Sequence, residues 1–273
     1  MPLNPKTIKY YNQLYNKLLK NGFDPTNKDY YSNCMKILDN LNLKYSSKSN
    51  YCKCLLFKNN ENIICLSEDD KKNISNFFNA TNKKYCDIVD KHQKLEYQEK
   101  NYLEWNEILK LYDQIMTKDN EQNKLLISFY VLLPPRRIDD YRHLYLTKSK
   151  PRKMDNNKNY LVYIKQPYLL FNNYKTNTTY KTQKILVPKK LKLLLDEYIK
   201  HMKNDKVFLY SDNTFKNIIF IIFKKYVSDK RISVNILRHS FISHQKFKNL
   251  KQRKKTAYKM AHSINLQLQY HKN

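Results

Sequence analysis

The chain has 273 residues, enough for one large domain or two of ordinary size. Hydrophobic residues make up 41% of it, which is enough to bury a core and excludes wholesale disorder. The 52 Lys and Arg residues outnumber the 24 Asp and Glu residues, giving a net charge of +28. This excess indicates a polyanionic partner. Nucleic acid is favoured over a membrane surface because the positive charge is spread along the whole chain.

The sequence shows no sign of a membrane span or of secretion. No apolar run approaches the ~20 residues of a transmembrane helix, and the first six residues lack the apolar stretch of a signal peptide. The odd number of cysteines, without paired zinc spacing, predicts free buried thiols in a reduced, intracellular protein. We therefore expect the protein to work wherever its target DNA resides: the nucleus, a viral factory or the cytoplasm. The cysteines are Cys34, Cys52, Cys54, Cys65 and Cys86.

The first 95 residues predict a basic helical unit. Apolar residues at helical spacing indicate helices over 7–20, 28–41 and 46–57, the last capped by Ser47 or Ser49. Gly22, the only glycine, is placed to end the first helix. A further helix is expected to begin after Ser67, and the polar stretch 87–100 suits a linker or an exposed helix. We interpret 1–95 as a helical DNA-binding domain with its linker.

The second part of the chain predicts helices around a small sheet. Helical spacing runs over 105–115 and over 125–133, where two prolines stop it. The runs 160–164 and 184–187 are strand-like and are separated by a polar stretch, after which helices are expected over 191–202 and 215–226. We predict a mainly α protein with a small antiparallel sheet, whose catalytic domain spans 103–273.

Arginine is rare and confined to this second part. Only seven of the cationic residues are Arg, and all lie beyond residue 135. A chain that otherwise uses Lys for charge is expected to keep Arg where a planar, bidentate donor is needed, as on a phosphate. The seven are Arg136, Arg137, Arg142, Arg152, Arg231, Arg238 and Arg253.

Four segments together resemble the boxes of the tyrosine recombinase (phage-integrase-like) family. The sequence Arg-Ile-Asp-Asp from Arg137 resembles its Arg-x-Ser-Glu box, and Ile-Leu-Arg-His-Ser-Phe around Arg238 resembles its His-x-Leu-Arg-His-(Thr/Ser)-Phe box. Met-Ala-His-Ser around His262, followed by Tyr270, resembles its Leu-Gly-His-Ser…Tyr ending. A Lys-Thr pair between the strands is the fourth feature. The N-terminal helices resemble the family's core-binding domain, so the resemblance covers nearly the whole chain.

The same residues suit metal-free cleavage of a phosphodiester. Arg137 and Arg238 can neutralise the pentavalent transition state, and the hydroxyl of Tyr270 can form a phosphotyrosyl bond that preserves the energy for religation. A lysine between the strands can protonate the departing 5′-oxygen, and His262 can donate to a non-bridging oxygen. The lysine is Lys175 or Lys181, with Lys175 preferred because of its longer match to the family's hairpin.

One departure from the family pattern concerns Asn235, which stands where the family has its first box His. An amide can donate a hydrogen bond to phosphate, but it is neither acid nor base near neutral pH. His239 could compensate, although a structural role suits it better. The resemblance implies that the site residues are Arg137, Lys175, Asn235, Arg238, His262 and Tyr270, acting with no metal, cofactor or ATP.

The resemblance implies a site-specific DNA recombinase or integrase. It would cleave and rejoin double-stranded DNA through a 3′-phosphotyrosyl intermediate, as a homotetramer on DNA. The Lys- and Asn-rich composition suits a virus or mobile element with an AT-rich genome. Two alternatives remain open: type IB topoisomerase-like relaxation of DNA, and a non-catalytic DNA-binding protein with a decayed active site.

Overall fold

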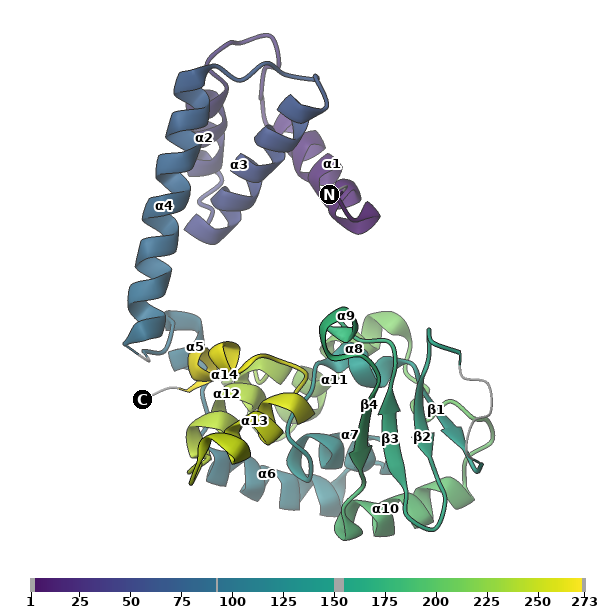
Figure 1. Ribbon diagram of the computed structural model, residues 1–273. Helices are drawn as coiled ribbons and strands as arrows, with labels where there is room; N and C mark the ends of the chain where they lie inside the picture. Colours follow the sequence, from purple (N-terminus) through teal and green to yellow (C-terminus); the bar gives the residue numbers. More distant parts are fainter. Residues whose placement is uncertain (1–2, 92, 150–154, 272–273) are drawn as a thin grey trace. The chain divides into compact units, whose positions relative to one another are not determined.

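The computed structural model describes residues 3–91, 93–149 and 155–271 (Figure 1). The chain divides into two compact units, Met1–Lys91 and His92–Asn273. That 1–95 and 103–273 fold as separate domains stays a prediction. Arg152, one of the seven arginines, lies outside the described residues.

The first unit is helical. Gly22 follows its first helix with φ of +89°, a left-handed conformation that ends the helix, as predicted. The fourth helix begins after Ser67, whose Oγ accepts a 3.0 Å hydrogen bond from the backbone N–H of Asp70. The third helix begins earlier than expected, at a cap residue Lys44, so Ser47 and Ser49 lie inside it. The helices are α1 (Pro5–Lys20), α2 (Tyr30–Asn40), α3 (Tyr45–Asn60) and α4 (Glu68–Asp90).

The thiols of this unit are only partly as expected. Cys34, Cys52 and Cys54 are buried in its core, and burial raises the pKa of the Cys52 thiol to about 11. Such thiols stay protonated and behave as small apolar groups. Cys65 and Cys86 are exposed, so the prediction of buried thiols is wrong for these two. Cys65 alternates with the core residues Ile64 and Leu66 on the connection between α3 and α4, which leaves its side chain outside the core, and Cys86 lies on α4 beyond the residues that reach the core.

The second unit packs helices around a small sheet (Figure 1). The polar stretch 87–100 is partly helical, because α4 continues to Asp90 and a short helix follows from Glu96. The helices are α5 (Glu96–Asn101), α6 (Trp105–Lys118), α7 (Glu121–Val131), α8 (Ile138–Arg142), α9 (Asn177–Tyr180), α10 (Lys189–Lys200), α11 (Asp212–Lys224), α12 (Val234–His244), α13 (Leu250–Lys259) and α14 (Ile264–Tyr270).

Within the described residues the sheet has four strands, in the order β1-β2-β3-β4. β2 (Asn159–Val162), β3 (Tyr168–Phe171) and β4 (Gln183–Leu186) are antiparallel, but β1 (Leu144–Thr147) pairs with β2 in parallel. The sheet is therefore mixed, and the prediction of an antiparallel sheet is correct only for its last three strands. β1 and β3 were not predicted. The four residues of β3 are all buried, so its sequence shows no alternation of apolar and polar residues.

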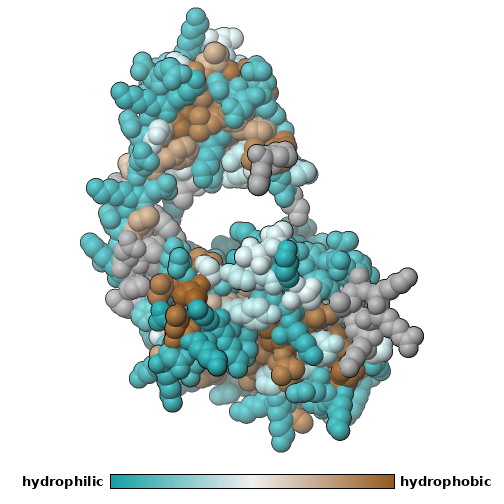
Figure 2. Space-filling model, in the orientation of Figure 1, coloured by the Kyte–Doolittle hydropathy of each residue, from teal (hydrophilic) through white to brown (hydrophobic). Residues whose placement is uncertain are grey.

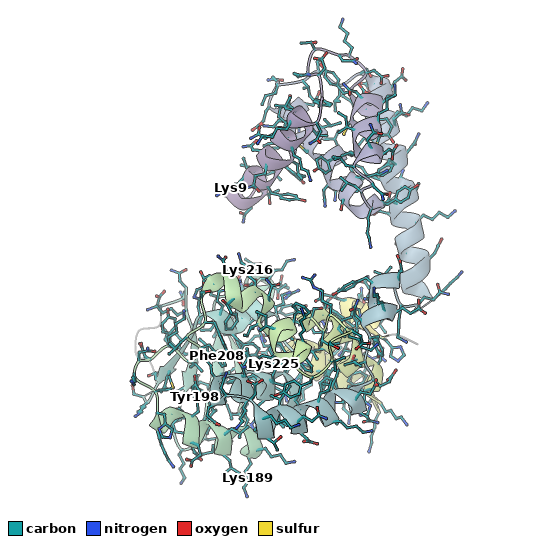
Figure 3. The ribbon with its side chains drawn as sticks, turned by 180° about the vertical axis from the view of Figure 1, so that it is seen from behind. Lys9, Lys189, Tyr198, Phe208, Lys216 and Lys225 are labelled. Atoms are coloured by element: carbon teal, nitrogen blue, oxygen red, sulfur yellow. The ribbon has the colours of Figure 1, made fainter. Side chains whose placement is uncertain are left out.

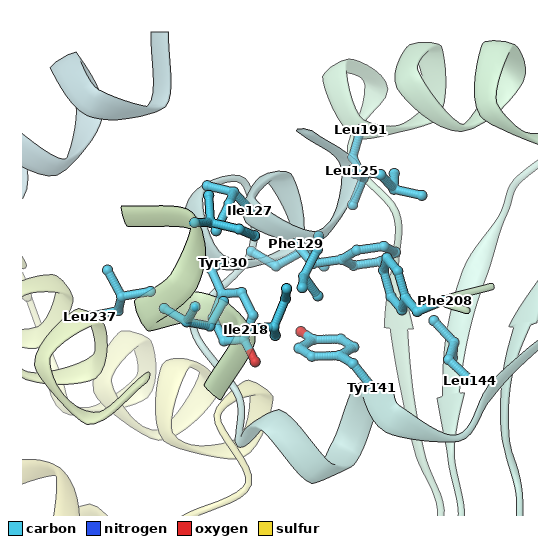
Figure 4. Close-up of a cluster of buried hydrophobic side chains, with 14 of the residues drawn as sticks. Leu125, Ile127, Phe129, Tyr130, Tyr141, Leu144, Leu191, Phe208, Ile218 and Leu237 are labelled. Carbon is cyan, nitrogen blue, oxygen red and sulfur yellow. The ribbon is translucent and has the colours of Figure 1, made fainter. Parts of the chain in front are cut away.

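Side-chain alternation along the strands gives the sheet one face toward the main core. Leu161, Leu169 and Ile185 are aligned across three strands and belong to that core. Helices α7 and α11 contribute further apolar side chains, among them Phe129 and Ile218 (Figure 4). This core fixes the helices that carry the candidate site, since α8 and α12 begin directly against it.

Candidate active site

Arg238 and His262 form a buried pair at the centre of the site. The Arg238 side chain, on α12, is fully buried, and its Nη2 atom lies 3.1 Å from Nδ1 of His262. A guanidinium can only donate, so Nδ1 accepts and the hydrogen-bond network assigns the imidazole proton to Nε2. Within the described part of the chain, that buried Nε2–H has no hydrogen-bond partner. The site therefore holds a donor directed at no protein acceptor.

His262 is kept neutral by its surroundings. Burial, together with the positive charges of Arg238, Arg137 and Arg136, lowers the pKa of His262 to about 3. A neutral imidazole with its proton fixed on Nε2 can donate a hydrogen bond to an anionic oxygen. It is a poor proton acceptor at neutral pH, so its role in phosphate chemistry would be donation.

Arg137 lies at the edge of this pair and faces a pocket. It is the cap residue of α8, two residues after the second helix-breaking proline, and its side chain is half-buried. Burial and the nearby charge of Arg238 lower its pKa from the ordinary arginine value, without removing its charge. The pocket, of about 500 Å³, is also lined by Lys216, Arg231 and Asn235. An anion entering it would meet several donors.

Its neighbour Arg136 points instead into the core. The side chain is 2% exposed, and Nε donates to Oδ2 of Asp140 at 2.8 Å. Nη1 donates to Oε1 of Gln183 at 2.7 Å, and the guanidinium carbon lies 3.9 Å from the centre of the Phe171 ring. Arg136 therefore ties α8 to strands β3 and β4, and of the two adjacent arginines only Arg137 is placed for a ligand.

Three arginines bind three successive carbonyl oxygens where α13 ends. The last carbonyls of a helix lack intrahelical donors and carry partial negative charge, so cations are favourable there. These bonds fix the turn that leads to His262. The pairs are Arg136 with Lys259 at 3.0 Å, Arg238 with Met260 at 3.4 Å, and Arg137 with Ala261 at 3.2 Å.

The two candidate lysines lie on the segment between β3 and β4. Thr176 Oγ1 donates to the carbonyl of Ala261 at 3.0 Å, which places the residue after Lys175 on the turn that Arg137 binds. Lys181 lies further along the same segment, where its backbone carbonyl accepts a hydrogen bond from the Tyr174 hydroxyl at 2.5 Å. Both lysines are exposed. Only Lys175 has a direct chain neighbour that contacts the turn.

Tyr270 is the last residue of α14 and lies over the buried pair. The guanidinium carbon of Arg238 is 4.8 Å from the centre of the Tyr270 ring, and the rings of His262 and Tyr270 are 5.4 Å apart. The Tyr270 side chain is half-buried. A phenol on the α14 helix is thus held beside two of the donors that the sequence singled out.

The structure gathers most of the predicted residues at one place. Arg238, His262 and Tyr270 are in mutual contact, and Arg137 binds the carbonyl of Ala261, next to the Met260 carbonyl that Arg238 binds. Asn235, exposed in the first turn of α12, lines the pocket with Arg137. Lys175 is connected only through Thr176. What each of these residues does remains a proposal.

Three contributors were not identified from the sequence: the core role of Arg136, the anchor Thr176, and the buried Gln98, which contacts His239. The adjacent Arg136 and Arg137 looked alike as sequence, and only their burial separates them. The Lys-Thr pair gave a signal for Thr176, but in a chain this rich in Lys it was weak. Nothing in the local sequence marked Gln98, because its partner lies 141 residues away.

Known proteins match this chain in fold but not in sequence. No family model matches the sequence, and no curated protein matches it. Among solved structures, the Tn1549 transposon integrase (residues 82–397) in complex with circular intermediate DNA is 15% identical, with a TM-score of 0.57, covering 99% of this chain and 90% of that one. The XerA recombinase is 13% identical with a TM-score of 0.45, covering 99% of this chain and 89% of that one.

The match to the transposon integrase shows that this chain, mainly α with a small sheet, has the fold of that integrase. At 15% identity it shows the fold alone.

Proposed function

We propose that the protein is a site-specific DNA recombinase or integrase that cleaves and rejoins double-stranded DNA through Tyr270. The observation that carries this proposal is the buried, unpartnered Nε2–H of His262, held by Arg238 beside the Tyr270 ring. A buried donor without a partner costs about 1–3 kcal/mol, so such a group suits a site completed by a ligand. The ligand that fits two guanidiniums and an imidazole donor is a phosphate.

In the proposed reaction the Tyr270 oxygen attacks the scissile phosphorus. A phosphorus–oxygen bond to Tyr270 forms while the bond to the 5′-oxygen breaks, leaving a 3′-phosphotyrosyl link. Lys175 supplies the proton to the departing 5′-oxygen. Because Asn235 has no basic atom, we assign the phenolic proton to water. Arg137, Arg238 and His262 stabilise the charge on the non-bridging oxygens, and religation reverses these steps.

The surface beside the site supports a nucleic-acid substrate. A second hollow, of about 380 Å³, adjoins the pocket of Arg137 and shares Tyr97, Phe220 and Arg231 with it. Cationic side chains line both: Lys216 lines the pocket of Arg137, and Lys224 and Lys230 line the second hollow. Lys216 lies at the upper edge of this unit as Figure 3 shows it. The cationic lining of these two adjoining hollows suits the phosphate backbone on one side of the cleaved bond. The DNA complex formed by the structurally similar integrase also supports DNA as the substrate.

Trapping of a covalent adduct tests the proposal. A pool of short nicked duplexes with randomised sequence, incubated with the protein, is expected to yield adducts that survive denaturing electrophoresis and release a selected sequence. Tyr270→Phe removes only the nucleophilic oxygen, so it should bind DNA but form no adduct. Tyr258→Phe, a change to an exposed tyrosine on α13, is the matched control and should form adducts normally.

The outcomes separate the alternatives. If the wild type forms no adduct with any duplex in the pool, the protein is a non-catalytic DNA-binding protein with a decayed active site. An adduct from Tyr270→Phe would place the nucleophile elsewhere, with Tyr258 or Tyr226 tested next. Exchange of strands between two selected duplexes identifies a recombinase, whereas relaxation of supercoiled DNA without exchange identifies topoisomerase-like activity.

We also propose that four copies assemble on paired DNA sites and that the protein comes from a virus or mobile element with an AT-rich genome. Sedimentation of the protein with the selected duplex tests the assembly. A complex holding two proteins and one duplex, with no larger species, would contradict it.

A further inference from the structure

His239 lies buried between the end of α14 and the start of the second unit. Its Nδ1 is 2.9 Å from the carbonyl oxygen of Tyr270, and the two rings are 4.6 Å apart. Its Nε2 is 2.7 Å from Nε2 of Gln98, on α5. Gln98 is buried as well. These contacts form a continuous path from α5, through α12, to the residue proposed as the nucleophile.

The hydrogen bonds along this path have one consistent direction. Oε1 of Gln98 accepts from the backbone N–H of Leu95 at 2.9 Å, so the amide NH₂ of Gln98 faces His239. His239 Nε2 must then accept, and its proton lies on Nδ1, from which it donates to the Tyr270 carbonyl. Each residue of the path is therefore hydrogen-bonded to the next one.

The α5 end of the path is firmly held. The Asn101 side chain accepts from the backbone N–H of Arg231 at 2.5 Å, and the Ser240 hydroxyl donates to the Leu103 carbonyl at 2.5 Å. The Tyr270 end belongs to a helix of only seven residues, which is too short to be stable without tertiary contacts. His239 therefore connects a fixed segment to a short helix whose last residue must be placed accurately.

On this basis we infer that His239 and Gln98 are positioning residues that hold Tyr270 against Arg238 and His262. The inference rests on the proposed function of Tyr270. Neither side chain is placed to contact the phosphate, and His239 acts through the backbone of Tyr270. A misplacement of about 1 Å can cost on the order of 10²-fold in rate, so loss of this path should slow the chemical step and leave DNA affinity unchanged.

Four variants test the inference. His239→Phe keeps an aromatic ring but removes both nitrogens. Gln98→Leu removes the donor to Nε2 of His239 together with the oxygen that accepts from the Leu95 N–H. His239→Asn keeps an amide donor near the position of Nδ1, so it can still bind the Tyr270 carbonyl. Glu99→Gln, on an exposed position of the same short helix, is the matched control.

Three measurements are compared for each variant: affinity for the selected duplex, the single-turnover rate of adduct formation at saturating DNA, and amide hydrogen exchange over 264–270. His239→Phe is expected to lower the rate by about 10- to 100-fold, with unchanged affinity and faster exchange in α14. Gln98→Leu should do the same to a smaller extent. His239→Asn should recover most of the rate, and Glu99→Gln should match the wild type.

A wild-type rate in both His239→Phe and Gln98→Leu would overturn the inference. So would a loss of rate in His239→Phe that His239→Asn fails to recover, because that result would indicate a merely structural ring. If the wild type forms no adduct, the proposed function fails. The exchange measurement then still decides the inference, since unchanged protection of 264–270 in the variants would refute it.

Discussion

At the residue scale, Arg136 and Arg137 show how adjacent identical side chains take different roles. Arg136 has its charge neutralised by Asp140, and its Nε and Nη1 atoms donate to groups inside the protein, whereas Arg137 is half-buried beside a pocket. Burial raises the pKa of Asp140, although the charge of Arg136 opposes that shift. The ion pair with Arg136 offsets the free-energy cost of burying this carboxylate in the core.

Removing Arg136 should therefore destabilise the fold. Arg136→Met keeps the length of the side chain but leaves the carboxylate of Asp140 buried without its cation. We expect a loss of about 3–5 kcal/mol in the free energy of unfolding, measured by urea titration. In a double-mutant cycle with Asp140→Asn, the combined loss should be smaller than the sum of the single losses. Additive losses would show that the pair is not coupled.

The low pKa of His262 predicts a dependence of stability on pH. The folded value of about 3 lies below the ordinary 6.5, so as pH falls below 6.5 the unfolded chain binds a proton that the folded protein does not. His262 therefore supports stability above pH 6.5 and loses that support toward pH 3, at up to about 1.4 kcal/mol for each pH unit. Urea titrations at several pH values should show a shallower loss for His262→Gln. Parallel curves would contradict the prediction.

At the scale of elements, the segment between β3 and β4 is bound through Thr176 to a turn held by three arginines. Thr176 binds the Ala261 carbonyl that Arg137 also binds, so two hydrogen bonds to one oxygen connect this segment and Arg137 to the α13–α14 turn. The backbone of Ala261 is left-handed, with φ of +54°, a conformation that lets the turn present its carbonyls to these donors. The site is thus assembled by loops and helix ends supported by the core.

This arrangement predicts that Lys175, and not Lys181, protonates the leaving oxygen. Lys175→Ala should slow adduct formation on the selected duplex severely, while Lys181→Ala should have a small effect. A duplex with sulfur in place of the 5′-bridging oxygen provides the test, because a thiolate leaves without a proton. The sulfur substrate should restore cleavage by Lys175→Ala. If it instead restores Lys181→Ala, the assignment of the two lysines is reversed.

At the scale of the whole molecule, positive charge is the dominant property. Hydrophilic side chains cover much of the visible face of each unit (Figure 2), and no described helix is long and apolar enough to cross a membrane. The net charge of +28 belongs to both parts of the chain, with cationic residues on the helices of the first unit as well as around the pocket of the second. Contacts with many phosphates are expected from this distribution.

DNA binding should therefore depend steeply on salt. If about 6–10 phosphates are neutralised, affinity should fall by about 10³–10⁵ between 50 and 200 mM salt. The logarithm of the binding constant, measured against the logarithm of salt concentration, gives the number of phosphates directly. Removing one cation of the pocket by Lys216→Ala should lower that slope by about one unit. A flat profile would mean that the positive charge does not form the binding surface.

Several helices, their ends and part of the candidate site could be predicted from local sequence. Apolar spacing predicted the long helices, Gly22 the end of the first one, and Ser67 the start of the fourth, because these features depend on a few neighbouring residues. The arginine count and the four boxes selected Arg238, His262 and Tyr270, which the structure brings together. A reaction that requires particular residue types can be predicted from those residues in the sequence, even where the sequence does not predict the tertiary fold.

Tertiary structure alone decided the rest. It paired β1 with β2 in parallel, buried Arg136 while leaving Arg137 beside a pocket, and put Gln98 against His239. Each of these outcomes depends on which distant segments meet, and on the desolvation and hydrogen bonding that follow from their contact. Such long-range partners set burial, protonation and strand direction, and no local pattern of residues specifies them.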